Sequence, residues 1–167
     1  MATDFIISGI QKAEIQHLFS LSNEELTSRG ITRMTVDEYP GYPCRLSLED
    51  APIGEEVLAF NYEHHAIQSP YRASGPVFVR LNQEAAQLEK NEIPAMLLHR
   101  YLSLRVYDDH GMMIDATTVV GEHLEDAIQT IFRDPAAKYI QVHNARPGCY
   151  NCQVDRIPKG PGGDFLQ

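Results

Sequence analysis

The segment that decides the fold covers residues 102–116 and reads LSLRVYDDHGMMIDA. Apolar and polar residues alternate on both sides of a DDHG turn (108–111), which is the pattern of two antiparallel strands joined by a tight loop. A three-residue loop that ends at Gly111, with that glycine left-handed, keeps the apolar residues of both arms on one face. This register places Arg105 opposite Asp115 and predicts a cross-strand ion pair.

A second hairpin is predicted at the end of the chain, on either side of an Arg-Pro-Gly turn (146–148). Alignment of the apolar residues in its two strands pairs Val142 with Cys152. In a regular ladder this register puts His143 and Cys149 on one face of the sheet and Cys152 on the other.

The clearest helix signal lies at Ser22 and Glu25, whose spacing forms a capping box. Gly30 follows where a left-handed residue would end that helix. Apolar periodicity and turn residues assign the remaining elements. We predict helices over 23–29, 83–90, 94–100 and 124–132, and further strands over 4–10, 31–38, 57–63 and 76–81.

These elements do not alternate strictly as strand, helix, strand, which disfavours a doubly wound parallel sheet. We expect an α+β fold with a mainly antiparallel, curved sheet and two or three short helices packed on it. The 167 residues suit one domain, which we assign to residues 1–157. Residues 158–167 are rich in proline and glycine, so we expect an extended C-terminal tail there.

The charge balance disfavours two classes of partner. Lys and Arg number 14 against 23 Asp and Glu, for a formal net charge of −9. Nucleic acids and anionic membranes select basic surfaces, so neither is expected as a partner. The N-terminal residues contain neither a basic stretch nor a long apolar run, which predicts a cytoplasmic protein. An odd number of cysteines, three, indicates free thiols in such a compartment.

The cysteines suggest two kinds of site. Cys149 and Cys152 with His143 upstream supply part of a zinc site, but a tetrahedral site needs four ligands, so no metal or cofactor is expected. A thiolate nucleophile needs an adjacent imidazole, and Cys44 or Cys149 could take His64 or His143 for that purpose. A small buried cysteine with no chemical role is the alternative.

Two polar stretches supply further candidates, residues 61–65 (NYEHH) and 69–76 (SPYRASGP). Proline and glycine constrain the second stretch, and polar side chains on constrained loops commonly line pockets; an exposed connection is the alternative. Arg105 is either an ion-pair partner of Asp115 or a guanidinium at a pocket wall. The candidate ligand-binding residues are Arg45, Asn61, Tyr62, Tyr71, Ser74, Arg105, Asp115 and Asn144.

Five strings occur in order along the chain: 41–48 (GYPCRLSL), 61–64 (NYEH), 70–76 (PYRASGP), 111–116 (GMMIDA) and 143–150 (HNARPGCY). Together they resemble a bacterial family of domains of unknown function, the one numbered 1203. The resemblance extends to about Ile157 and implies a bacterial, single-domain protein of similar length. Cys152 departs from the family's pattern, which weakens a Cys-x-x-Cys role. The resemblance implies no activity, substrate or catalytic residue.

Two functions follow from these residues. The first is the binding of a small polar ligand in a pocket lined by His, Asn, Tyr and Arg. The alternative is a cysteine- and histidine-dependent hydrolase or acyl transferase, which would require a cysteine of perturbed pKa. A homodimer formed through an open sheet edge is a further expectation.

Overall fold

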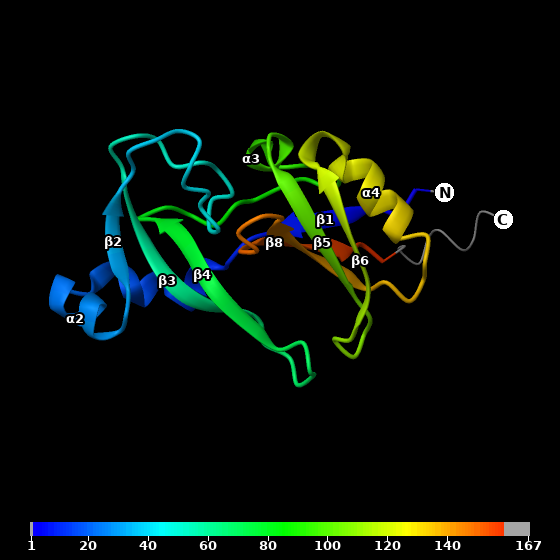
Figure 1. Ribbon diagram of the computed structural model, residues 1–167, viewed down its shortest axis with the longest axis horizontal. Coiled ribbons are helices and arrows are strands. Elements are labelled where there is room, and N and C mark those ends of the chain that lie inside the picture. Colours follow the sequence, from blue (N-terminus) through cyan, green and yellow to red (C-terminus); the bar gives the residue numbers. More distant parts are fainter. Residues whose placement is uncertain (1, 159–167) are drawn as a thin grey trace.

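The computed structural model describes residues 2–158, which form two antiparallel sheets lying side by side (Figure 1). The larger sheet has the strand order β1-β8-β7-β5-β6 and the smaller has the order β2-β3-β4. In chain order the elements, with η for a 3-10 helix, are β1 (Phe5–Ser8), α1 (Lys12–Ile15), η1 (Gln16–Ser20), α2 (Asn23–Ser28), β2 (Thr32–Thr35), β3 (Glu56–His65), β4 (Ala73–Arg80), α3 (Ala95–Leu98), β5 (Tyr101–Tyr107), β6 (Met113–Val120), η2 (Gly121–His123), α4 (Leu124–Ile131), β7 (Tyr139–Asn144) and β8 (Tyr150–Arg156).

The structure confirms the α+β class and the antiparallel pairing. It differs from the expectation in two respects, because residues 2–158 contain two sheets instead of one and four short α-helices instead of two or three. The predicted tail, apart from Pro158, lies outside the described residues.

The larger sheet packs one face against α4. Leu102 and Leu104 of β5 are fully buried, and so are Leu124 and Ile128 of α4, which belong to the same apolar cluster. A spacing of four residues puts the two helix side chains on one face, so α4 covers the sheet with an apolar stripe.

The smaller sheet packs against the N-terminal helices. Leu58 and Phe60 of β3 share a buried cluster with Ile15, Leu18 and Leu26. The predicted capping box starts α2, because the Ser22 hydroxyl accepts the Glu25 amide hydrogen at 3.2 Å. The helix ends as predicted before Gly30, whose φ of 73° is left-handed.

The first hairpin has the predicted left-handed Gly111, with φ 73°, but not the predicted register. A bulge lies between the pairs Val106–Asp115 and Tyr107–Met113, so Arg105 stands opposite Ala116. The Arg105–Asp115 ion pair was therefore wrong. The prediction assumed a regular ladder in which Asp115 would avoid the apolar face of the sheet. Because β6 is an edge strand, Asp115 can lie on the side of the sheet that α4 covers and still be exposed to solvent.

The last hairpin has the predicted Val142–Cys152 pair, followed by a second bulge. The next pair is His143–Tyr150, so one residue of β8 is skipped, and the Asn144 amide then donates to the Cys149 carbonyl at 2.9 Å. The prediction that His143 and Cys149 share a face was wrong, because the extra residue reverses the alternation of side chains beyond it.

The helix predicted over 83–90 was also wrong, since this segment has no regular secondary structure. It connects the two sheets, and its Ala86 amide donates to the Leu46 carbonyl at 2.8 Å. An extended chain spans about 3.3 Å per residue against 1.5 Å for a helix, so the connection favours an extended path over weak helical propensity.

Candidate functional site

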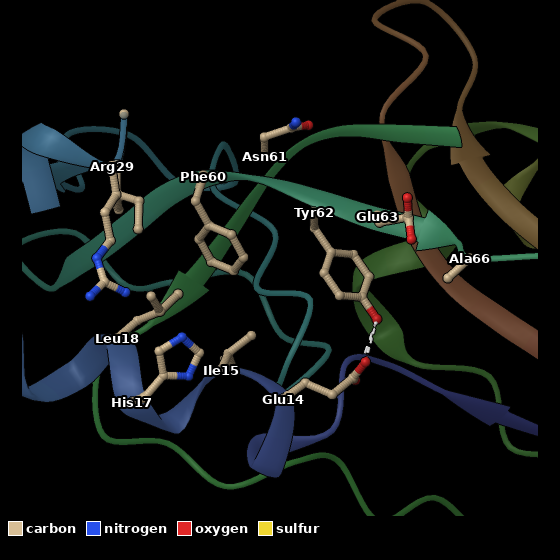
Figure 2. A pocket seen from close by; sticks show the side chains of 12 residues that line it. Glu14, Ile15, His17, Leu18, Arg29, Phe60, Asn61, Tyr62, Glu63 and Ala66 are labelled. Carbon is tan, nitrogen blue, oxygen red and sulfur yellow. Dashed lines mark hydrogen bonds between the residues drawn. The ribbon is translucent and has the colours of Figure 1, made fainter. Parts of the chain in front are cut away.

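A cleft of about 450 Å³ lies between β3 and the N-terminal helices (Figure 2). Its centre is apolar, because the Phe60 ring of β3 extends toward Leu18 and Ile15 on the opposite wall. The local sequence explains this arrangement. In β3, Phe60 and Tyr62 are two residues apart and therefore point to the same face of the strand, toward the helices.

The two ends of the cleft have opposite charge. Figure 2 shows Arg29 and His17 at one end and Glu14 and Glu63 toward the other. Glu63 is already neutralised by Arg72, which donates to its two carboxylate oxygens at 3.0 and 3.1 Å. The guanidinium of Arg29 forms no hydrogen bond or ion pair with residues 2–158. A free cation therefore lies across an apolar centre from the Glu14 carboxylate.

Tyr62 forms the wall beside Glu14. Its hydroxyl donates to the Glu14 carboxylate, at 3.1 Å to one oxygen and 3.3 Å to the other. Burial and then the Glu14 charge raise the pKa of Tyr62, so its hydroxyl stays protonated and keeps donating. Glu14 also accepts the Gln11 backbone hydrogen at 3.0 Å, which holds the carboxylate at the start of α1.

The sequence found only one wall of this cleft. Of the predicted residues, Tyr62 points into the cleft, whereas the Asn61 side chain points away from it (Figure 2). Glu14, His17 and Arg29 were missed. Their spacing within the first 30 residues matches no catalytic or ligand-binding motif. Only the fold shows that these side chains face β3 across the cleft.

Behind Tyr62, a second cluster joins the two sheets. The rings of Tyr62 and Tyr150 lie 6.1 Å apart, and Tyr150 stacks on His64 with ring centroids 5.1 Å apart. His64 in turn meets the edge of His143, at 4.9 Å between centroids. The sequence-predicted His64 and His143 are therefore brought together from strands of different sheets.

The hydrogen bonds define the tautomer of both rings. The Gln141 amide nitrogen donates to the His64 carbonyl at 2.7 Å, so its oxygen accepts from Nδ1 of His64 at 2.8 Å. Nδ1 of His143 donates to the Gly148 carbonyl at 2.9 Å. In the neutral rings both Nε2 atoms are therefore unprotonated, and Nε2 of His143 is buried without a partner among the described residues.

Burial strongly perturbs this pair. Burial is the largest cause of the lowered pKa of both rings, and Arg105 contributes in the same direction to both. Together with the other groups around it, these effects lower the pKa of His143 to about 3. Arg105 lies on β5 directly opposite Gln141, on the same sheet face as His143. Arg105 therefore does not pair with Asp115. Its positive charge lies near His64 and His143 and disfavours their protonation.

Both ring nitrogens of the neighbouring His65 have hydrogen-bond partners. Its Nδ1 donates to the carbonyl of Tyr71 at 2.8 Å, and its Nε2 accepts from the Tyr139 hydroxyl at 2.6 Å. The Tyr107 ring packs 4.1 Å from the His65 ring, centroid to centroid. This histidine and the Tyr71 backbone therefore bind the end of β3 to the larger sheet.

Comparison with known proteins gives one match. The family described as "Protein of unknown function (DUF1203)" matches residues 41–156. The chain belongs to the DUF1203 family. The match contains the β3 wall of the cleft and all the histidines of the cluster between the sheets, whereas Glu14, His17 and Arg29 precede it. No curated protein and no solved structure matches the chain.

In this DUF1203 chain the three cysteines lie in different environments. Cys44 is fully buried, and its sulfur accepts backbone hydrogens of Ser47 and Arg80 at 3.4 and 3.2 Å. Cys152 is buried in the larger core, which raises its pKa to about 12. Cys149 is partly exposed and accepts from the Asn144 side chain at 3.2 Å. No hydrogen bond joins any of these thiols to an imidazole within residues 2–158.

Arg45 and Asn144 belong to the junction of the sheets and not to the cleft. Arg45 is 1% exposed, and it donates to the carbonyls of Tyr150 and Pro43, both at 2.7 Å. The Asn144 oxygen accepts from the side chain of Asn151 at 2.8 Å. The Arg45 bond to Tyr150 ties the segment after Pro43 to the last hairpin, and the Asn144 bond to Asn151 lies within that hairpin, so both predicted residues have a structural role.

Two predicted residues lie apart from both clusters. Ser74 is exposed on β4, and Asp115 is exposed on β6 beside α4. Within the described part of the DUF1203 chain, no three His, Cys, Asp or Glu side chains come close enough to hold a metal ion. In residues 2–158, no helix has the length and apolar character that crossing a bilayer requires.

Proposed function

We propose that this DUF1203 protein binds a small ligand in the cleft of Figure 2, and that the ligand has an apolar body with a carboxylate at one end and an amine at the other. One observation carries the proposal: the unpaired Arg29 guanidinium and the Glu14 carboxylate lie at opposite ends of an apolar centre. An ω-amino acid such as 6-aminohexanoate has this pattern of charges, because its methylene chain separates the carboxylate from the amine. His17 and Tyr62 add polar groups to the wall of the cleft.

The expected affinity is modest, because the cleft is open to solvent. Burial of one side of a pentamethylene chain removes on the order of 100 Å² of apolar area from water, worth about 2.5 kcal/mol. Two exposed ion pairs add up to about 1 kcal/mol each. A total near 4 kcal/mol corresponds to a Kd of about 1 mM, so ligands must be screened at millimolar concentration.

The test is a two-dimensional amide NMR titration with 6-aminohexanoate, hexanoate and hexylamine, each raised to about 10 mM. Hexanoate lacks the amine and hexylamine lacks the carboxylate, so the three probes separate the two ends of the cleft. We expect 6-aminohexanoate to shift amides in residues 14–31 and 60–66, and each one-ended probe to bind several-fold more weakly.

Arg29→Gln removes the free cation, and Arg133→Gln is its matched control. Both arginines are exposed and lie within two residues of the end of a helix, α2 for Arg29 and α4 for Arg133. Arg29→Gln should weaken the binding of 6-aminohexanoate and of hexanoate about fivefold and leave the binding of hexylamine unchanged. Binding that Arg29→Gln and Arg133→Gln affect equally, or shifts confined to other parts of the chain, would contradict the proposal.

The proposal favours binding over catalysis, because no thiol hydrogen bonds to an imidazole in residues 2–158, as the cysteine- and histidine-dependent alternative would need. We also propose a location in the bacterial cytoplasm, which the free, partly exposed thiol of Cys149 supports because thiols remain reduced in that compartment. Nucleic acid stays disfavoured as a partner for a chain with a net charge of −9.

A further inference from the structure

The outer edge of β6 is unprotected, unlike the other sheet edges of residues 2–158. At the opposite edge of the larger sheet, Asn91 covers β1 and exchanges hydrogen bonds with the Phe5 backbone, each 2.9 Å long. In the smaller sheet, the Arg45 amide donates to Phe78 of β4 at 2.9 Å, and β2 is only four residues long. Strand β6 has eight residues, contains no proline or lysine, and pairs with β5 alone.

The edge presents regularly spaced backbone donors. The Ala116 amide hydrogen bonds to the carboxylate of its neighbour Asp115 at 2.8 Å, so it points away from β5. Because backbone groups alternate along a strand, Thr118 and Val120 also direct their amides outward. Such an edge is a template on which an extended chain can add as another strand.

A groove of about 620 Å³ lies along this edge between β6 and α4. Figure 1 shows that these two elements are neighbours. Asp115, Thr117 and Val119 line it from the strand, and Asp126 and Asp134 are among the residues that line it from the helix side. The lining includes three carboxylates and no lysine or arginine. Alternate side chains of an added strand would enter this groove, where basic groups are favoured.

We propose that β6 and this groove bind an extended basic peptide segment by strand addition, with Lys or Arg at alternate positions. Backbone bonds to Ala116 and Thr118 supply the register, and the three aspartates select the charge. A basic side chain attracts the Asp115 carboxylate, which releases the Ala116 amide for the incoming strand.

Charge favours such a peptide over a second copy of this chain. An antiparallel pair of β6 strands would carry Asp115 of each copy toward the acidic groove of the other, where like charges repel. Each copy also has a net charge of −9, which opposes association. The predicted homodimer through an open edge is therefore the competing outcome for this surface.

The test measures fluorescence anisotropy of a labelled eight-residue peptide that alternates Lys and Val, with blocked ends. One control peptide replaces Lys by Glu, and a second carries N-methyl groups at alternate residues, which removes the donors that would face β6. The full-length protein is compared with Asp115→Asn/Asp126→Asn and with Glu24→Gln, an exposed glutamate on α2, as the charge control.

We expect the Lys peptide to bind, and the double variant to weaken it about tenfold, from about threefold per aspartate. Glu24→Gln should change the affinity less than twofold, and the Glu and N-methyl peptides should not bind measurably. If the N-methyl peptide binds as well as the unmodified Lys peptide, strand addition is overturned. If Asp115→Asn/Asp126→Asn and Glu24→Gln change the affinity equally, the role of the groove in binding is overturned. Sedimentation that shows a dimer of the free protein, abolished by Thr118→Pro, would overturn the proposal in favour of self-association.

Discussion

His143 should make the stability of the protein depend steeply on pH below neutrality. Its side chain is fully buried, and burial lowers its pKa to about 3 from an ordinary value of 6.5. The Gly148 carbonyl opposes this shift, while Arg105, His64 and Arg45 increase it. The unfolded chain therefore accepts a proton at residue 143 over a range of pH where the native protein does not.

The sign and size of the effect follow from this difference in proton binding. The stabilising contribution of the neutral ring is fully present above pH 6.5 and is lost as pH falls from 6.5 toward 3. Within that window the loss approaches about 1.4 kcal/mol per pH unit. Between pH 7.5 and pH 5 it amounts to about 2 kcal/mol. Burial lowers the pKa of His64 as well, so its contribution has the same sign.

The assay is urea unfolding at pH 7.5 and pH 5 for the native sequence, His143→Gln and the control His110→Gln, whose side chain is 81% exposed. Carboxylates also titrate in this range, so the quantity of interest is the difference in pH dependence between proteins. Between pH 7.5 and pH 5, we expect the free energy of unfolding of His143→Gln to fall by about 2 kcal/mol less than that of the native chain. That of His110→Gln should fall as much as that of the native chain. A difference below about 0.5 kcal/mol would refute the reasoning. If His143→Gln does not fold, an NMR pH titration of the His143 imidazole in the native protein tests the same reasoning. A His143 ring that titrates near pH 6.5 would contradict it.

Three further predictions concern packing, capping and thiol access. A Cβ on Gly121 would lie 1.8 Å from the Leu97 carbonyl oxygen, whereas one on Gly75 meets nothing within 4 Å. Gly121→Ala should therefore lower the free energy of unfolding by about 3 kcal/mol or more, and Gly75→Ala by less than about 1 kcal/mol, as measured by urea titration. Ser22→Ala removes the bond to the Glu25 amide and should lower Tm by a few degrees, equivalent to about 1 kcal/mol, whereas Ser28→Ala at the other end of α2 should change it less. Alkylation followed by mass spectrometry should modify Cys149 in the native protein and spare Cys44 and Cys152 until it unfolds, and rapid native modification of Cys152 would contradict its burial.

The local elements of this fold could be predicted because their causes lie within a few residues. The Ser22–Glu25 capping box and the left-handed Gly111 involve only neighbours in sequence, and the apolar spacing of α4 is visible within its eight residues. The same locality explains why the class of fold, with its two antiparallel hairpins, followed from alternation and turn residues.

Tertiary structure decided the register of both hairpins and the composition of the candidate site. The bulges beside Val106 and Val142 depend on which side chains the opposite layer buries, and alternation along one strand contains no such information. His64 and His143 meet only because strands of two different sheets approach each other, and Arg29 faces Glu14 only across an intervening apolar floor. Local propensity therefore determined the elements, whereas long-range burial determined which charged groups face one another and which lose their solvent.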